Sequence, residues 1–192
     1  TLEEIATLLA TTPGAVKAAL HRGRGRLGEP ETGLASRRPR PSTELLDRFI
    51  ERYDAQDVPG LVALMLNGGT AENVGNSFHV GTRDADGVPR FVQAVVHGHP
   101  EWPREFQPDA ERLERSELEG EPVVLAFRVY GGRPERLTSI FRFDEEDGRI
   151  ARIRSYAFCP ETIRAAGEQL GVRVLTGIYH APAPVQEGAS ER

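Results

Sequence analysis

The sequence contains a single cysteine, Cys159, which excludes an internal disulfide and a thiolate metal site made by this chain alone. Its apolar runs are only a few residues long, far short of the roughly 20 residues that span a bilayer. The given sequence does not open with the basic and then apolar residues that are typical of a signal peptide. These features predict a cytoplasmic protein that contacts no membrane.

Charge is unevenly distributed along the 192 residues, although the net charge of −5 is modest. Residues 1–40 have a balance of +3, so the remainder carries −8. A hydrophobic content of 39% is ordinary for a folded soluble protein. The sequence therefore predicts a small basic module followed by a larger acidic one. Because it starts at Thr1 and not at methionine, we expect a fragment of a longer chain.

Two helices in close succession are predicted at the start of the chain. Thr1 and Glu4 have capping-box spacing, and the apolar positions that follow predict a helix over 2–10. Thr12 before Pro13 is a second start signal, which predicts a helix over 13–27. Two helices joined by so short a turn are typical of a helix-turn-helix.

The predicted second helix has an apolar face and a basic face. Val16, Leu20 and Leu27 share the apolar face, while Lys17, His21 and Arg24 lie beside it. Basic side chains on such a helix can bind DNA phosphates and bases. The alternative is that they are solvated and favour the helix C-terminal dipole.

The stretch TLEEIATLLATTPGAVKAALHRGRGRL resembles the final helix-turn-helix of the extracytoplasmic-function sigma factors of bacterial RNA polymerase. The resemblance implies that residues 1–28 are a DNA-binding module that recognises the minus-thirty-five promoter element. Its partners would be promoter DNA and the RNA polymerase core. The implied DNA contacts are Lys17, Ala18, His21, Arg22 and Arg24.

A linker is predicted over 29–41, where prolines and glycines replace any apolar periodicity. The second module begins at residue 42. Ser42 and Thr43 signal the start of a helix, and a shorter helix follows that includes Leu61 to Met65. An Asn67-Gly68-Gly69 turn follows. After it we expect an extended stretch over 70–80, a helix over 87–98, and two hairpins, over 111–130 and 135–158.

Ile150 and Ile153 are an odd number of residues apart, so strict alternation cannot place both on one face of a strand. A bulge, or a sheet buried on both sides, would reconcile them and predicts strong curvature. Helices packed into a curved antiparallel sheet give an α+β cone. Residues 42–160 resemble in this order the SnoaL-like domains of the nuclear-transport-factor-two superfamily, and 161–192 would form a C-terminal helix and an extended tail.

The cone would enclose a pocket, for which His79, Trp102 and Tyr156 are the predicted lining residues. The polar candidates show no spacing that defines a base, a donor and an orienting partner; they are Glu72, His79, His97, His99, Trp102, Asp109 and Tyr156. The sequence also contains no cysteine cluster and no His-Glu-x-x-His helix. We therefore expect no catalysis, no metal and no cofactor.

The main hypothesis is a sigma factor fragment that recognises promoter DNA for transcription initiation and whose cone domain regulates its activity. The alternative is a SnoaL-like enzyme or ligand-binding domain, with a small molecule in the cone, that has a DNA-binding appendage. A conventional repressor is a third hypothesis, and it would require a dimer to bind a palindromic site. Whether the cone domain forms a homodimer is left open by the sequence.

Overall fold

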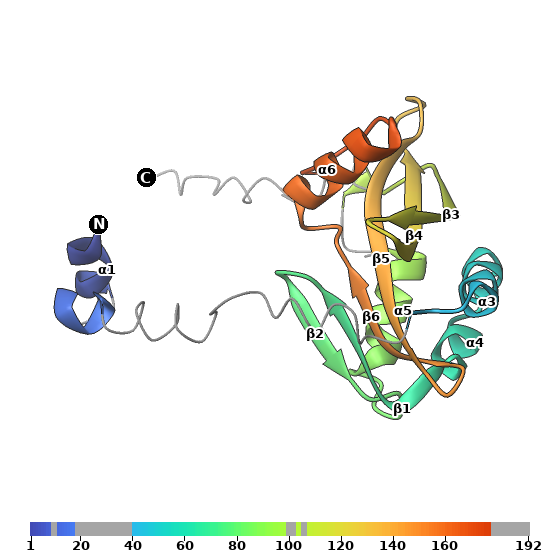
Figure 1. The fold of residues 1–192 in the computed structure, drawn as a ribbon, viewed down its shortest axis with the longest axis horizontal. Helices are drawn as coiled ribbons and strands as arrows, with labels where there is room; N and C mark the ends of the chain where they lie inside the picture. The colour runs from blue at the N-terminus through green and yellow to red at the C-terminus, as the bar shows by residue number, and fades with distance from the viewer. Residues whose placement is uncertain (9–10, 18–39, 99–102, 105–106, 178–192) are drawn as a thin grey trace, which may run out of the picture. The chain divides into compact units, whose positions relative to one another are not determined.

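The computed structural model divides into two compact units, Thr1–Arg38 and Pro39–Arg192, and each is described by itself (Figure 1). The residues that the structure describes are 1–8, 11–17, 40–98, 103–104 and 107–177. Within these ranges, no helix is both long and apolar enough to cross a membrane.

The first unit begins with α1 (Leu2–Leu8). The Glu4 N–H donates to Thr1 Oγ1 at 3.2 Å, as the predicted capping box requires. Thr12 Oγ1 accepts from the Ala15 N–H at 3.1 Å and caps a second helical stretch, described over 13–17. The rest of the predicted second helix, with four of the five predicted DNA contacts, lies outside the described residues. A complete helix-turn-helix therefore stays a prediction.

A curved six-stranded sheet in the order β2-β1-β6-β5-β4-β3 organises the second unit (Figure 1). Both predicted hairpins are confirmed, β3 with β4 and β5 with β6. The sheet is not wholly antiparallel, however, because β1 and β6 pair in parallel. The strands are β1 (Met65–Asn73), β2 (Ser77–Val80), β3 (Ala110–Leu118), β4 (Glu121–Val129), β5 (Arg136–Glu146) and β6 (Arg149–Ser155).

The predicted turn at Asn67-Gly68-Gly69 is wrong, because these residues lie inside β1. The pairing of β1 with β6 shifts register between Met65 and Thr70. Gly69 is buried in this irregular stretch, and a Cβ there would lie 2.9 Å from the Leu66 carbonyl oxygen. Glycine is thus required for close backbone approach within a strand and does not mark a turn. Met65, predicted in a helix, is likewise a strand residue.

Both features offered to reconcile Ile150 with Ile153, a bulge and a sheet buried on both sides, are present in the structure. Asp144 of β5 faces Arg152, whereas the next residue, Glu145, faces Ile150, so Ala151 is the additional residue on β6. Both isoleucines consequently lie in the same buried cluster. Such an insertion bends a strand and increases its local twist, which contributes to the curvature of the sheet.

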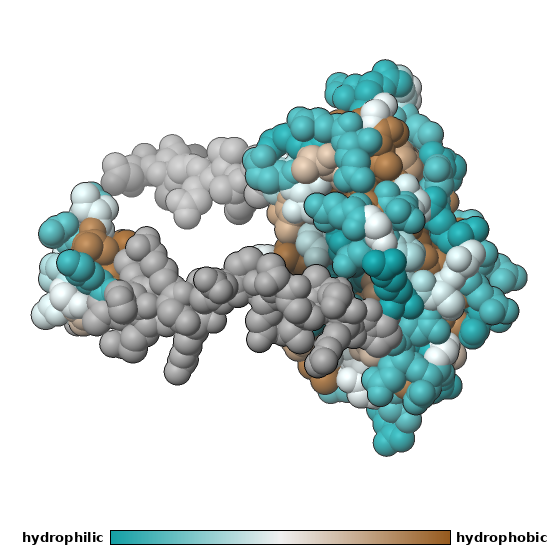
Figure 2. Space-filling model, in the orientation of Figure 1, coloured by the Kyte–Doolittle hydropathy of each residue, from teal (hydrophilic) through white to brown (hydrophobic). Residues whose placement is uncertain are grey.

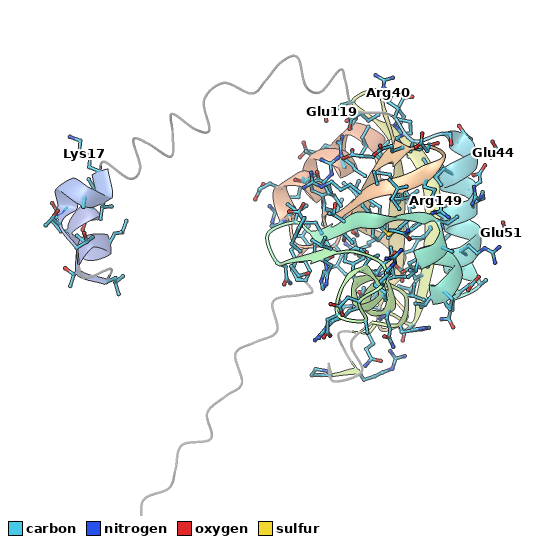
Figure 3. All side chains as sticks on the ribbon, turned by 90° about the horizontal axis from the view of Figure 1, so that it is seen from below. Lys17, Arg40, Glu44, Glu51, Glu119 and Arg149 are labelled. Atoms are coloured by element: carbon cyan, nitrogen blue, oxygen red, sulfur yellow. The ribbon has the colours of Figure 1, made fainter. Side chains whose placement is uncertain are left out.

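Four helices pack on the sheet: α3 (Thr43–Asp54), α4 (Val58–Ala63), α5 (Val88–His97) and α6 (Pro160–Leu170). The Ser42 side chain caps α3 by accepting from the Leu45 N–H, as predicted. Leu45, Leu46 and Phe49 of α3 are buried, whereas Glu44 and Glu51 extend into solvent (Figure 3). The helix predicted over 87–98 is also confirmed, and the predicted C-terminal helix is α6, which starts at Pro160 and ends at Leu170.

The sheet is buried on both faces. Val124 and Ala126 of β4 belong to the cluster that includes residues of α3, α4 and α5, while Val123 and Leu125 belong to the cluster beneath α6. Figure 1 accordingly shows α6 on one side of the sheet and α3 to α5 on the other. On the face seen in Figure 2, hydrophilic residues cover most of this unit.

A substitution at Phe49 tests how α3 packs against the sheet. It is 4% exposed, and its ring lies 4.9 Å from that of Phe143. Phe49→Ala is expected to lower the free energy of unfolding by about 3–5 kcal/mol, because it removes buried area and leaves a cavity. Phe78→Ala, at a site 57% exposed, is the matched control and should cost less than about 0.5 kcal/mol in urea unfolding. Equal losses in the two variants would contradict this packing.

Candidate ligand-binding site

A cavity of about 1190 Å³ lies between the sheet and helices α3 and α5. Phe91 and Val95 of α5 and Phe141 of β5 contribute apolar walls. Tyr53 of α3, Glu111 of β3 and Arg128 of β4 contribute a polar floor. The curvature of the sheet produces this hollow, because bent strands lift away from the helices that cover them.

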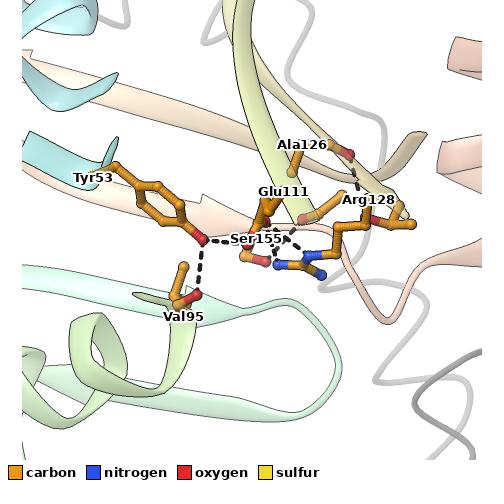
Figure 4. A network of polar contacts seen from close by, with 8 residues as sticks. Tyr53, Val95, Glu111, Ala126, Arg128 and Ser155 are labelled. Atoms are coloured by element: carbon orange, nitrogen blue, oxygen red, sulfur yellow. Dashed lines mark hydrogen bonds and ion pairs between the residues drawn. The ribbon is translucent and has the colours of Figure 1, made fainter. Parts of the chain in front are cut away.

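The floor is a hydrogen-bonded network of three side chains (Figure 4). Glu111 and Arg128 are direct cross-strand partners in the pairing of β3 with β4. Arg128 donates to Glu111 Oε1 from Nε at 2.8 Å, and its Nη2 lies 2.7 Å from the same oxygen. The Tyr53 hydroxyl lies 2.9 Å from Glu111 Oε2 and 2.8 Å from the Val95 carbonyl oxygen.

Burial makes this network costly unless it is satisfied. The side chains of Arg128 and Glu111 are only 8% and 16% exposed. Removing one member of a buried ion pair leaves an uncompensated charge, so the two residues depend on each other. Burial, followed by the negative charge of Glu111, raises the pKa of Tyr53 above its ordinary value. The phenol is therefore held neutral in the folded protein.

Glu111 is poorly suited to act as a general base. A general base needs an acceptor that faces the proton it removes from a substrate. Oε1 of Glu111 is engaged by Arg128 and Oε2 by Tyr53. The network therefore fits a structural and binding role better than proton transfer.

His79 of β2 lines the cavity. Its Nδ1 lies 3.2 Å from the Asp86 carbonyl oxygen, so Nδ1 donates to that oxygen. Its Nε2 lies 3.3 Å from Ser77 Oγ, and its ring centroid lies 5.9 Å from that of Phe91. These contacts fix the imidazole against the end of the cavity beside α5.

The other two predicted pocket residues are not placed in the cavity. Trp102 lies outside the described residues. Tyr156 packs against the cluster beneath α6, on the opposite face of the sheet. Strand alternation explains this position, because Ser155 faces the cavity and the next residue points the other way.

Among the described residues, the remaining sequence candidates do not assemble a second site. Glu72 forms an ion pair with Arg152, and Asp109 forms one with Arg104. His97 lines the cavity, while His99 is outside the described residues. Among the residues that the structure describes, no group of three metal-ligating side chains comes together.

The network residues themselves were missed by sequence reasoning. Tyr53, Glu111 and Arg128 were not among the predicted site residues. A signal for Arg128 existed, since it is a charged residue within the strongly apolar strand β4. A charge in such a strand is seldom buried without a partner, so it pointed to a buried ion pair.

Comparison with known proteins adds little to this geometry. No family model and no curated protein matches the chain. Among solved structures, a candidate polyketide cyclase from Sinorhizobium meliloti is 17% identical with a TM-score of 0.42, covering 60% of this chain and 95% of its own. A candidate ketosteroid isomerase from Kribbella flavida is 16% identical with a TM-score of 0.42, covering 78% and 87%.

An NTF2-like protein of unknown function from Cytophaga hutchinsonii is 12% identical with a TM-score of 0.39, covering 61% of this chain and 90% of its own. Two of these three neighbours bear names of enzymes. Likeness at TM-scores below 0.5 assigns neither a family nor a reaction.

Tyr53→Phe tests the network through its dependence on pH. It should lower the free energy of unfolding by about 1–3 kcal/mol, because buried acceptors lose their donor. In the unfolded wild-type chain Tyr53 ionises at about pH 10, whereas in the folded protein it stays neutral at that pH. Stability from Tyr53 is thus fully present below about pH 10 and is lost as the pH rises further.

The measurement is urea unfolding at about pH 8 and about pH 11, where the wild type should lose about 1 kcal/mol more than Tyr53→Phe. Tyr156→Phe is the control and should keep the alkaline loss of the wild type. An alkaline loss that is the same in all three proteins would show that Tyr53 is not held neutral by burial.

Proposed function

We propose that the second unit binds a small molecule with both apolar and polar groups in its cavity. The observation that supports this most directly is the combination of a large hollow, apolar walls and a floor whose buried charges are paired with each other. Ligand sites are commonly concave and apolar, with a few fixed polar groups that orient the ligand. Binding is favoured over catalysis because both oxygens of Glu111 are already engaged.

We further propose that the first unit recognises promoter DNA as part of a sigma factor. The support is the motif over residues 1–27, together with the Thr12 cap, the buried Val16 and the exposed Lys17 of the described helix start (Figure 3). Polymerase would supply the chemistry of initiation. The acidic second unit would then modulate promoter recognition, since its negative field opposes that of DNA-binding cations.

Ala94→Phe provides the test of the cavity. Ala94 lies on α5 and lines the hollow, so a larger side chain there should fill space that a ligand needs. With the uncharged fluorescent probe N-phenyl-1-naphthylamine, we expect affinity to fall about tenfold or more, while Tm changes little. Gln93→Phe, at the neighbouring exposed position, should bind like the wild type. Equal binding by all three proteins would place the probe elsewhere.

Run-off transcription with core polymerase tests the first unit within its full-length parent protein. Combined replacement of Lys17, His21 and Arg22 by alanine is expected to abolish promoter-specific initiation, because base and phosphate contacts are lost. The matched control replaces Arg37, Arg38 and Arg40 by alanine. It removes three basic side chains from the predicted linker, as many as the first variant removes from the predicted DNA-binding helix. Initiation that survives the first triple replacement would refute the assigned DNA contacts.

A further inference from the structure

The end of the cavity beside β2 contains a chain of three hydrogen-bonded side chains. Asn73 of β1 and Ser77 and His79 of β2 all line the hollow. Asn73 Nδ2 donates to Ser77 Oγ at 3.3 Å, and Ser77 Oγ lies 3.3 Å from His79 Nε2. Ser77 and His79 are two residues apart on one strand, so their side chains point to the same face of the sheet. A hydroxyl and an imidazole thus meet inside the hollow.

The direction of each hydrogen bond follows from what the atoms can donate. The Asp86 carbonyl oxygen only accepts, so His79 Nδ1 carries the proton that it donates there, at 3.2 Å. In the neutral imidazole Nε2 is then an acceptor, and the Ser77 hydroxyl donates to it. The proton of Ser77 therefore points at a base whose tautomer is fixed by the backbone.

Ser155 provides a contrast within the same cavity. Its hydroxyl lies 3.2 Å from that of Ser139, and both residues are buried. Neither hydroxyl of such a pair takes up a proton near neutral pH, whereas an imidazole does. Of these two cavity serines, Ser77 is therefore the one placed to lose its proton to a neighbour.

We propose that Ser77 is a nucleophile toward a carboxylic ester bound in the cavity, with His79 as its general base, a proposal that rests on the ligand-binding function of that cavity. An activated nucleophile needs a base within hydrogen-bond reach and a third group that orients the base. His79 is the base, and the Asp86 carbonyl oxygen is the orienting group. The distance of 3.3 Å is at the long end, as is common for catalytic hydrogen bonds before a substrate is bound.

The reaction consists of two acyl transfers. Ser77 Oγ forms a bond to the ester carbonyl carbon while its proton passes to His79 Nε2. The bond from that carbon to the alkoxy oxygen then breaks, and His79 returns the proton to the leaving alcohol. Water attacks the resulting acyl-serine with His79 again as the base, which releases the carboxylic acid and restores the Ser77 hydroxyl.

Asn73 is placed to assist both transfers. Its Nδ2 donates to Ser77 Oγ and carries a second N–H. An asparagine amide beside a nucleophile can donate to the oxyanion of the tetrahedral intermediate. The group that orients His79 is an uncharged carbonyl oxygen, which stabilises an imidazolium less than a carboxylate does. We therefore expect slow turnover.

The test is covalent labelling of the chain with an uncharged alkyl fluorophosphonate, which loses fluoride to an activated serine and stays bonded to its oxygen. Intact mass counts the labels, and peptide mapping locates them. The variants are Ser77→Ala and His79→Gln, with Ser116→Ala on β3, outside the cavity lining, as the control. Release of p-nitrophenolate from p-nitrophenyl butyrate measures the complete hydrolysis. Tm and binding of N-phenyl-1-naphthylamine show whether each variant is folded with its cavity intact.

We expect a single label on Ser77 in the wild type and in Ser116→Ala, and no label in Ser77→Ala. His79→Gln should be labelled about a hundredfold or more slowly, because the general base is lost. Ester turnover should fall in the same two variants and persist in the control.

A wild type that binds the amine but takes no label, or takes it on another serine, would overturn the nucleophile and leave the binding function standing. A label on Ser77 without ester turnover would overturn the hydrolysis. Failure of the wild type to bind the amine would overturn the proposed function, and the nucleophile would then stand only if Ser77 is still labelled.

Discussion

The ion pair between Glu111 and Arg128 is the constraint on which the site depends. Two charges so far removed from water are stable only if they compensate each other and the remaining oxygen is hydrogen-bonded. Tyr53 meets that second condition, and through the Val95 carbonyl it also holds α5. One network therefore ties α3, α5, β3 and β4 together around the cavity.

The same network determines what the cavity can accept. Since Glu111 and Arg128 neutralise each other, this pair offers polarity without net charge, while Phe91 and Val95 of α5 and Phe141 of β5 supply apolar contacts.

Local patterns predicted much of the fold but little of the site. The Ser42 cap, helix α5 and both hairpins follow from residues close in sequence, and the spacing of Ile150 and Ile153 predicted a bulge or a sheet buried on both sides. The parallel pairing of β1 with β6 joins segments about 80 residues apart and leaves no local signature. The bond from Tyr53 to Glu111 spans 58 residues, so it depended on the tertiary fold.

The most direct test of the account is a heteronuclear NMR titration of the wild-type chain with N-phenyl-1-naphthylamine, following backbone amide shifts. The account predicts that shifts concentrate at cavity residues such as Ala94, Val95 and Ser155. The amide shifts of residues on the side of the sheet opposite the cavity, such as Arg152 and Ala166, should not change. Shift changes confined to that opposite side, with no change at the cavity residues, would contradict a ligand site between α3, α5 and the sheet.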